Sequence, residues 1–200
     1  MNYKSLIVVL FAGVILILVM MAFVSSMYTD MLKIRLETEY VIIKVTDDEM
    51  MHVKCILGYH NPDRKNVPKT FKFPVAFAQN FSTPEIKSIL MTKILEEPKL
   101  GEEGKYIEWS GSLGDSERSN IRIEYRQKLL LKQVVFPLTS PEFERKDLLV
   151  ATYKVILPYT AKNIRCSYSE FEVTERKGRV YVVLEFKNFI PEEDLIVEWD

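Results

Sequence analysis

Asn120-Ile-Arg-Ile-Glu-Tyr-Arg126 alternates polar and apolar side chains without a break, and this stretch decides the fold class of the chain. Successive side chains of a β-strand point to opposite faces, so the stretch predicts a strand with one face in a core and the other in water. Residues 179 to 187 repeat the pattern. Together the two stretches assign to the core Ile121, Ile123, Val180, Val182, Leu184 and Phe186.

The same period of two recurs through most of the chain after residue 34. Further strands are expected at residues 34–45, 51–59, 70–77, 105–110, 130–136, 148–157, 164–173 and 195–199. Many short strands separated by turn signals are typical of an antiparallel β-sandwich, or of two small packed sheets, and this is the predicted fold. Gly178 is expected to close a hairpin, and a bulge near Ser169 or Glu170 is expected to bend the preceding strand.

One short helix is predicted to interrupt the strands. Ser82-Thr-Pro-Glu85 has the form of a capping box with proline in the first helical turn. The apolar residues that follow fall on one helical face: Ile86, Ile89, Leu90 and Ile94. We expect this helix to end before Pro98.

Residues 6–24 form a run of 19 uncharged, almost wholly apolar residues. As a helix rising about 1.5 Å per residue, such a run just spans a hydrocarbon core of about 30 Å. The run is either an uncleaved signal anchor or a signal peptide removed after Ser26. It is longer than the usual apolar region of a signal peptide, which favours an anchor that holds the chain in a lipid bilayer.

The predicted organisation is a signal anchor over residues 1–28 and a β-sandwich domain over residues 29–200. An internal boundary is considered near residues 138–147, where a proline lies among polar residues. The short tail before the anchor carries Lys4, and residues 25–32 carry no lysine or arginine. Lys33, Arg35 and Lys44 follow soon after the span, so the count of basic residues does not by itself orient it. The basic tail, which resembles the start of a signal sequence, and the lack of cations just after the span favour a body on the extracytoplasmic side of a single-pass membrane protein.

The charges of the chain are balanced and interspersed. It has 27 lysines and arginines, 28 aspartates and glutamates, and a formal net charge of −1. A nucleic-acid-binding domain usually has a clustered positive charge, so no nucleic-acid partner is expected.

Cys55 and Cys166 are the only cysteines. In an oxidising compartment they could form a disulfide that joins the two halves of the body. The alternative is two separate buried thiols, because pairing geometry cannot be derived from sequence. The sequence is compatible with both the disulfide and the two free thiols.

No metal, cofactor or catalytic site is predicted. Met50, Met51, His52 and Cys55 are ligands that suit a soft metal ion, but on a strand Met51 and Cys55 face away from the other two. No nucleophile elbow or other catalytic signature is present in the sequence. The sequence therefore favours a role other than catalysis.

The expected function is a protein-interaction or structural module of a cell-envelope assembly, held to the membrane and binding a protein partner through sheet edges or loops. The alternative is a surface domain that binds or hydrolyses carbohydrate with paired acids and exposed aromatic rings. Three or more coplanar exposed rings on one face would favour the alternative. The candidate rings are those of Tyr106, Trp109, Tyr125, Tyr153, Tyr168, Tyr181 and Trp199.

Overall fold

The computed structural model describes residues 15–21, 34–62, 68–76, 82–101, 104–114, 116–140, 143, 145 and 147–200. The chain divides into two compact units, Met1–Ile34 and Arg35–Asp200, which are described separately.

In the first unit the structure describes residues 15–21, which are helical and exposed. The rest of the predicted span over residues 6–24 lies outside the described residues. Among the residues that are described, no helix has the length and apolar character needed to cross a membrane.

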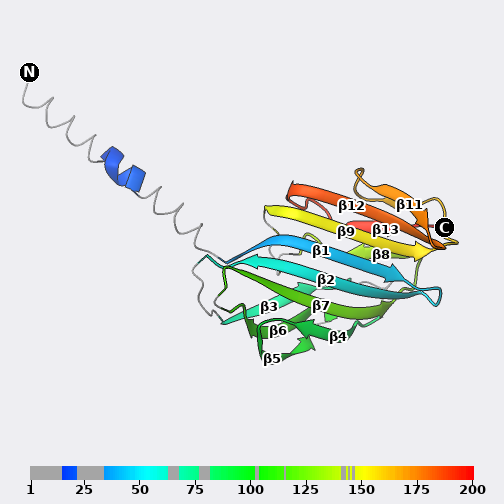
Figure 1. The fold of residues 1–200 in the computed structure, drawn as a ribbon, viewed down its shortest axis with the longest axis horizontal. Helices are drawn as coiled ribbons and strands as arrows, with labels where there is room; N and C mark the ends of the chain where they lie inside the picture. The colour runs from blue at the N-terminus through cyan, green and yellow to red at the C-terminus, as the bar shows by residue number, and fades with distance from the viewer. Residues whose placement is uncertain are drawn as a thin grey trace, which may run out of the picture. The chain divides into compact units, whose positions relative to one another are not determined.

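The second unit is built of β-strands (Figure 1). They are β1 (Arg35–Val45), β2 (Met50–His60), β3 (Pro68–Pro74), β4 (Glu85–Leu90), β5 (Lys93–Leu100), β6 (Tyr106–Ser112), β7 (Arg118–Lys128), β8 (Gln133–Phe136), β9 (Leu148–Pro158), β10 (Arg165–Cys166), β11 (Glu172–Arg176), β12 (Arg179–Phe189) and β13 (Leu195–Glu198). The predicted mainly β fold is therefore confirmed.

The strands form one large sheet and two small ones. The seven-stranded sheet has the order β11-β12-β9-β1-β2-β7-β4, and the three-stranded sheets have the orders β10-β13-β8 and β3-β6-β5. In Figure 1 the large sheet lies in front of β13, β8, β3 and β6. The architecture is a sandwich in which two small sheets share the inner face of one large sheet.

The large sheet is mixed, whereas the sequence predicted an antiparallel fold. β1 pairs parallel with β9, from Thr38 opposite Val150 to Lys44 opposite Ile156. The other pairings of the sheet are antiparallel. Alternation shows which side chains face the core but carries no information on strand direction, so this pair could not be predicted from sequence.

The predicted helix after Ser82 is wrong, because this segment forms β4 and β5. The Ser82 hydroxyl does not cap a helix; it accepts a hydrogen bond of 2.8 Å from the backbone N–H of Lys128, at the end of β7. β4 then pairs with β7 and β5 pairs with β6. Isoleucines at this spacing suit a strand as well as a helix. The strand forms here because β7 and β6 each offer an edge whose backbone groups pair with this segment.

The predicted hairpin at Gly178 is present, whereas the predicted bulge near Ser169 or Glu170 is replaced by a break between two strands. Lys177 and Gly178 have φ values of 50° and 67°, and they connect β11 to β12 as a two-residue turn of the kind that matches strand twist. The single strand expected over residues 164–173 is instead two strands, β10 and β11, which belong to different sheets. The break between them contains Ser169 and Glu170.

The core lies between the large sheet and the two small ones. Five of the six predicted core residues are buried, namely Ile121, Ile123, Val180, Val182 and Leu184. Phe186 is only half-buried, because it lies near the end of β12 where the inner face opens to solvent.

An ion pair is buried within this core. Arg145 donates hydrogen bonds of 2.8 and 3.0 Å to the two carboxylate oxygens of Glu39 on β1, and both side chains are fully buried. Tyr153 on β9 donates its hydroxyl to the same carboxylate at 2.9 Å. The guanidinium also donates to the carbonyl of Leu138 at 3.2 Å and lies 4.5 Å from the centre of the Phe143 ring. Among the described residues between 138 and 147, Leu138, Phe143 and Arg145 thus contribute to this buried cluster.

We expect Arg145→Met to lower the free energy of unfolding by about 3 to 5 kcal/mol, because it leaves the Glu39 carboxylate buried without its partner. The double variant Glu39→Met/Arg145→Met should recover a large part of this loss, since it removes both charges. Urea denaturation measures both values. Arg122→Ala, on the exposed face of β7, is the control and should change stability by no more than about 0.5 kcal/mol. An Arg145→Met variant as stable as this control would contradict the expected role of the pair.

Candidate anion-binding site on the large sheet

The outer face of the large sheet carries more cations than it can neutralise. Three acidic side chains pair there with cations: Glu124 with Lys54 at 3.4 Å, Glu85 with Arg126, and Asp47 with Arg179 at 3.1 Å. In the described part of the chain, no ion pair is formed by Lys44, Arg122, Lys154, Arg176 or Lys177. Two further carboxylates on this face, Glu172 and Glu185, also form no ion pair among the described residues. The five unpaired cations outnumber them, so the face has an excess of positive charge although the whole chain is close to neutral.

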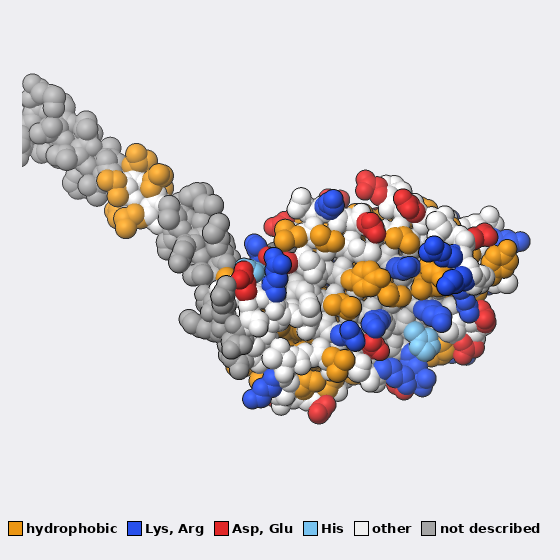
Figure 2. Space-filling view, viewed as in Figure 1, with side chains coloured by type: hydrophobic (Ala, Val, Ile, Leu, Met, Phe, Trp, Pro, Cys, Tyr) orange, Lys and Arg blue, Asp and Glu red, His pale blue; other side chains and the backbone are white. Residues whose placement is uncertain are grey.

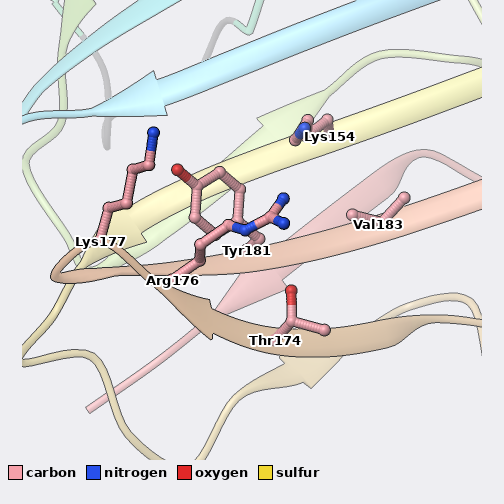
Figure 3. Close-up of a pocket in the computed structure, with 6 residues that line it drawn as sticks. All are labelled: Lys154, Thr174, Arg176, Lys177, Tyr181 and Val183. Atoms are coloured by element: carbon pink, nitrogen blue, oxygen red, sulfur yellow. The ribbon is translucent and has the colours of Figure 1, made fainter.

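Three of these free cations surround a shallow cup, which we define by Lys154, Thr174, Arg176, Lys177, Tyr181 and Val183. The cup has a volume of about 540 Å³. Figure 3 shows the Tyr181 ring between Lys177 on one side and Arg176 and Lys154 on the other. The Lys154 ammonium lies 5.2 Å from the centre of that ring, a cation–π contact that holds both side chains over the cup.

Strand register brings the cup together from three strands. Lys154 on β9 is opposite Val183 on β12, and Tyr181 on β12 is opposite Thr174 on β11. Arg176 and Lys177 come from the end of β11 and the turn that follows it. The left-handed backbone of this turn places a lysine at the rim of the cup.

An apolar band lies beside the cup on the same face. Register places Ile156, Ile42 and Ile56 on neighbouring strands with outward-facing side chains, each half-buried. Figure 2 shows the lysines and arginines of this face gathered around hydrophobic side chains. Register also places Lys154 and Lys54 directly opposite Ile42, so cations and half-buried apolar side chains alternate across these strands. Such a surface can contact both the charged and the apolar atoms of a partner.

The cup has the chemistry of an anion site. Two ammonium groups and a guanidinium supply N–H donors, and the Thr174 hydroxyl supplies another. A carboxylate or phosphate bound there would gain charge-assisted hydrogen bonds.

The soft-metal residues are divided as strand geometry predicts. Met51 and Cys55 are fully buried on the inner face of β2, whereas His52 is exposed on the outer face. Among the described residues, no group of three or more histidine, cysteine, aspartate or glutamate side chains could hold a metal ion.

The two cysteines are free thiols in the structure, so the disulfide between Cys55 and Cys166 is not formed. Cys55 is buried in β2, with its sulfur 3.8 Å from a carboxylate oxygen of Glu39. Cys166 is half-buried in β10, which belongs to a different sheet. Burial, and next the Glu39 charge, raise the pKa of the Cys55 thiol well above its ordinary value. Burial also raises the pKa of the Cys166 thiol.

We expect iodoacetamide to modify Cys166 in the folded protein and Cys55 only after unfolding. Alkylation requires an accessible thiolate, and Cys55 is both fully buried and held as the protonated thiol. Peptide mass mapping before and after denaturation measures the two reactions. A disulfide-linked peptide, or equal labelling of the two cysteines in the folded state, would contradict this expectation.

The candidate rings do not form a platform. Trp109, Tyr125, Tyr153 and Trp199 are buried in the core. Tyr106, Tyr168 and Tyr181 are half-buried and lie on β6, after β10 and on β12 respectively. These three rings are dispersed over the molecule, so the coplanar arrangement expected of a sugar-stacking surface is not formed by the candidates.

The cup could be predicted from the amino-acid sequence only in part. The phase of β12 predicts that Tyr181 faces outward, together with Arg179 and Glu185. It does not show that Lys154, some 27 residues earlier, lies beside that ring. The signal available from sequence was the basic turn after Thr174, which by itself resembles any solvated hairpin.

The fold recurs in solved structures. Yeast LTA4 hydrolase in complex with bestatin matches with a TM-score of 0.54 and 10% identity, over 84% of this chain and 29% of that one. A putative nutrient binding protein from Legionella pneumophila matches with a TM-score of 0.53 and 13% identity, over 82% and 66%. An M1 zinc metallopeptidase from Deinococcus radiodurans matches with a TM-score of 0.48, over 82% and 42%.

At these identities the likeness concerns the fold alone. The chain spans less than a third of the yeast hydrolase and about two thirds of the Legionella protein. No protein-family model matches the chain, and no curated protein matches its sequence.

Proposed function

We propose that this chain is a membrane-anchored β-sandwich that acts as a protein-interaction module of a cell-envelope assembly. Its body lies on the extracytoplasmic side, and its outer sheet face binds an acidic segment of a partner protein. The observation that carries this proposal is the cup of free cations beside the half-buried apolar band on the large sheet.

The position of the cup at a sheet edge supports an extended partner. β11 is an edge strand of the large sheet, and all five of its residues are exposed. Edge strands offer unpaired backbone groups to an added strand, which is a common mode of peptide recognition. An extended segment lying along β11 would bring acidic side chains within reach of Arg176 and Lys177.

The membrane anchor is supported by the sequence of residues 6–24 and by the absence of charge in that run. In the yeast hydrolase the matched region makes up 29% of the chain, so there a similar fold is one part of a larger protein. A tethered domain of this kind gains effective concentration toward any partner in the same membrane.

The first test concerns the anchor. A chain that begins at Met27 should be recovered in the soluble fraction, whereas the full chain should sediment with membranes and resist extraction by high salt. The reason is that the apolar residues of the body alternate and are buried in its own core. Sedimentation of the shortened chain with membranes in high salt would imply a second lipid-binding surface and contradict the proposal. Protease added to intact cells should cleave the body if it is extracytoplasmic.

The second test concerns the cup. The triple variant Lys154→Glu/Arg176→Glu/Lys177→Glu should lose the proteins that co-purify with the full chain from its native membrane, because it reverses the charge that attracts them. The retained amount is measured by quantitative mass spectrometry. Retention by the unaltered chain should also fall as salt concentration rises.

The matched control is Lys93→Glu/Lys132→Glu/Lys162→Glu. It makes the same change in net charge at three exposed lysines outside the cup. Equal retention of proteins by the two triple variants would contradict a specific role for the cup.

A further inference from the structure

A second cleft opens where β12 ends, and none of its lining residues belongs to the cup. It has a volume of about 660 Å³. Its lining includes three aromatic residues, Tyr168, Phe186 and Phe189, and three acidic residues, Glu170, Glu192 and Glu193. The cleft therefore has the size of a small-molecule site.

Aromatic rings form the base of the cleft. Phe186 and Phe189 stack with ring centres 4.2 Å apart and planes 10° apart. Tyr168 lies against both, at 5.4 and 5.7 Å and at steep angles. Because Tyr168 is inclined at 59° and 64° to the stacked pair, the three rings do not form a flat platform of the kind that stacks on a sugar ring.

The walls of the cleft are fixed by hydrogen bonds. The Tyr168 hydroxyl donates to the carbonyl of Glu193 at 2.6 Å, and the Ser167 hydroxyl donates to the carbonyl of Asp194 at 2.9 Å. The Asp194 carboxylate in turn accepts bonds of 2.9 and 3.0 Å from the backbone N–H groups of Leu138 and Thr139. A ligand would meet a preformed site and would lose little free energy in ordering it.

Only one sign of charge faces this cleft. The side chains of Glu170, Glu192 and Glu193 are exposed and line it, and no lysine or arginine is among the lining residues. In the part of the chain that the structure describes, these three carboxylates form no ion pair or side-chain hydrogen bond. A metal ion is not the ligand that fits, because no three acidic or histidine side chains converge on one point among the described residues.

We propose that this cleft binds a small organic cation, a quaternary or alkylated ammonium group. The rings of Phe186 and Tyr168 are half-buried and present π-electron density to such a cation, while the buried Phe189 supports Phe186 from below by stacking on it. The exposed carboxylates that line the cleft supply charge complementarity. The apolar rings also accommodate the carbon substituents of the ammonium group, which an inorganic cation lacks. The site is separate from the cup, so it stands whether or not the cup binds an acidic partner.

Choline and its uncharged isostere 3,3-dimethylbutan-1-ol test the proposal. Each is titrated into the full chain in a non-ionic detergent, and binding is followed by ligand-observed NMR and by calorimetry. Choline should bind saturably in the millimolar range or tighter, and the isostere should bind roughly tenfold more weakly because it has the same shape without the charge. Equal binding of the two compounds, or no binding of choline in this range, would overturn the proposal.

Two double variants distinguish the cleft from general surface charge. Glu192→Gln/Glu193→Gln should weaken choline binding by roughly tenfold, because it removes two rim carboxylates. Glu96→Gln/Glu97→Gln removes the same charge from β5 and should leave binding unchanged. All four side chains are exposed, so both proteins should fold, and their melting temperatures verify this. Equal weakening by the two variants would show that choline senses net charge rather than this cleft.

Discussion

The ion pair between Glu39 and Arg145 connects parts of the body that are far apart in sequence. Glu39 lies on β1, near the middle of the large sheet, while Arg145 lies in the segment that leads from β8 to β9. Burying two charges is costly unless each is fully satisfied, and here the carboxylate also accepts a hydrogen bond from Tyr153. The pair therefore links Arg145 to β1, and the strand that follows it, β9, pairs with β1 in the parallel direction.

The composition of the outer face of the large sheet follows from the burial of its inner face. A sheet with one apolar face packed on a core leaves the opposite residues of each strand in water. On β7 and β9 these outward positions hold Arg122 and Lys154, among others. The strand order then decides which outward residues become neighbours, and it places Lys154 beside Tyr181 without a carboxylate to neutralise it.

The cup and the aromatic cleft lie near β12 but have opposite charge. Three cations surround the cup, while three carboxylates line the cleft. Charges of opposite sign that are kept apart on one domain can orient it toward two different partners, because each surface repels the ligand of the other. The near-neutral net charge of the chain conceals this separation.

Alternation in the sequence determined the strands, their inward faces and most of the core, because a period of two is a local property of an extended backbone. It also determined the hairpin at Gly178, since few residues adopt a positive φ. The segment after Ser82 was predicted as a helix because local capping signals and isoleucine spacing fit one. Only the tertiary structure made it two edge strands, since β7 and β6 had backbone groups to pair with. The parallel pairing of β1 with β9, the cup and the cleft were likewise decided by tertiary structure, because each depends on contacts between residues distant in sequence, which no local pattern encodes.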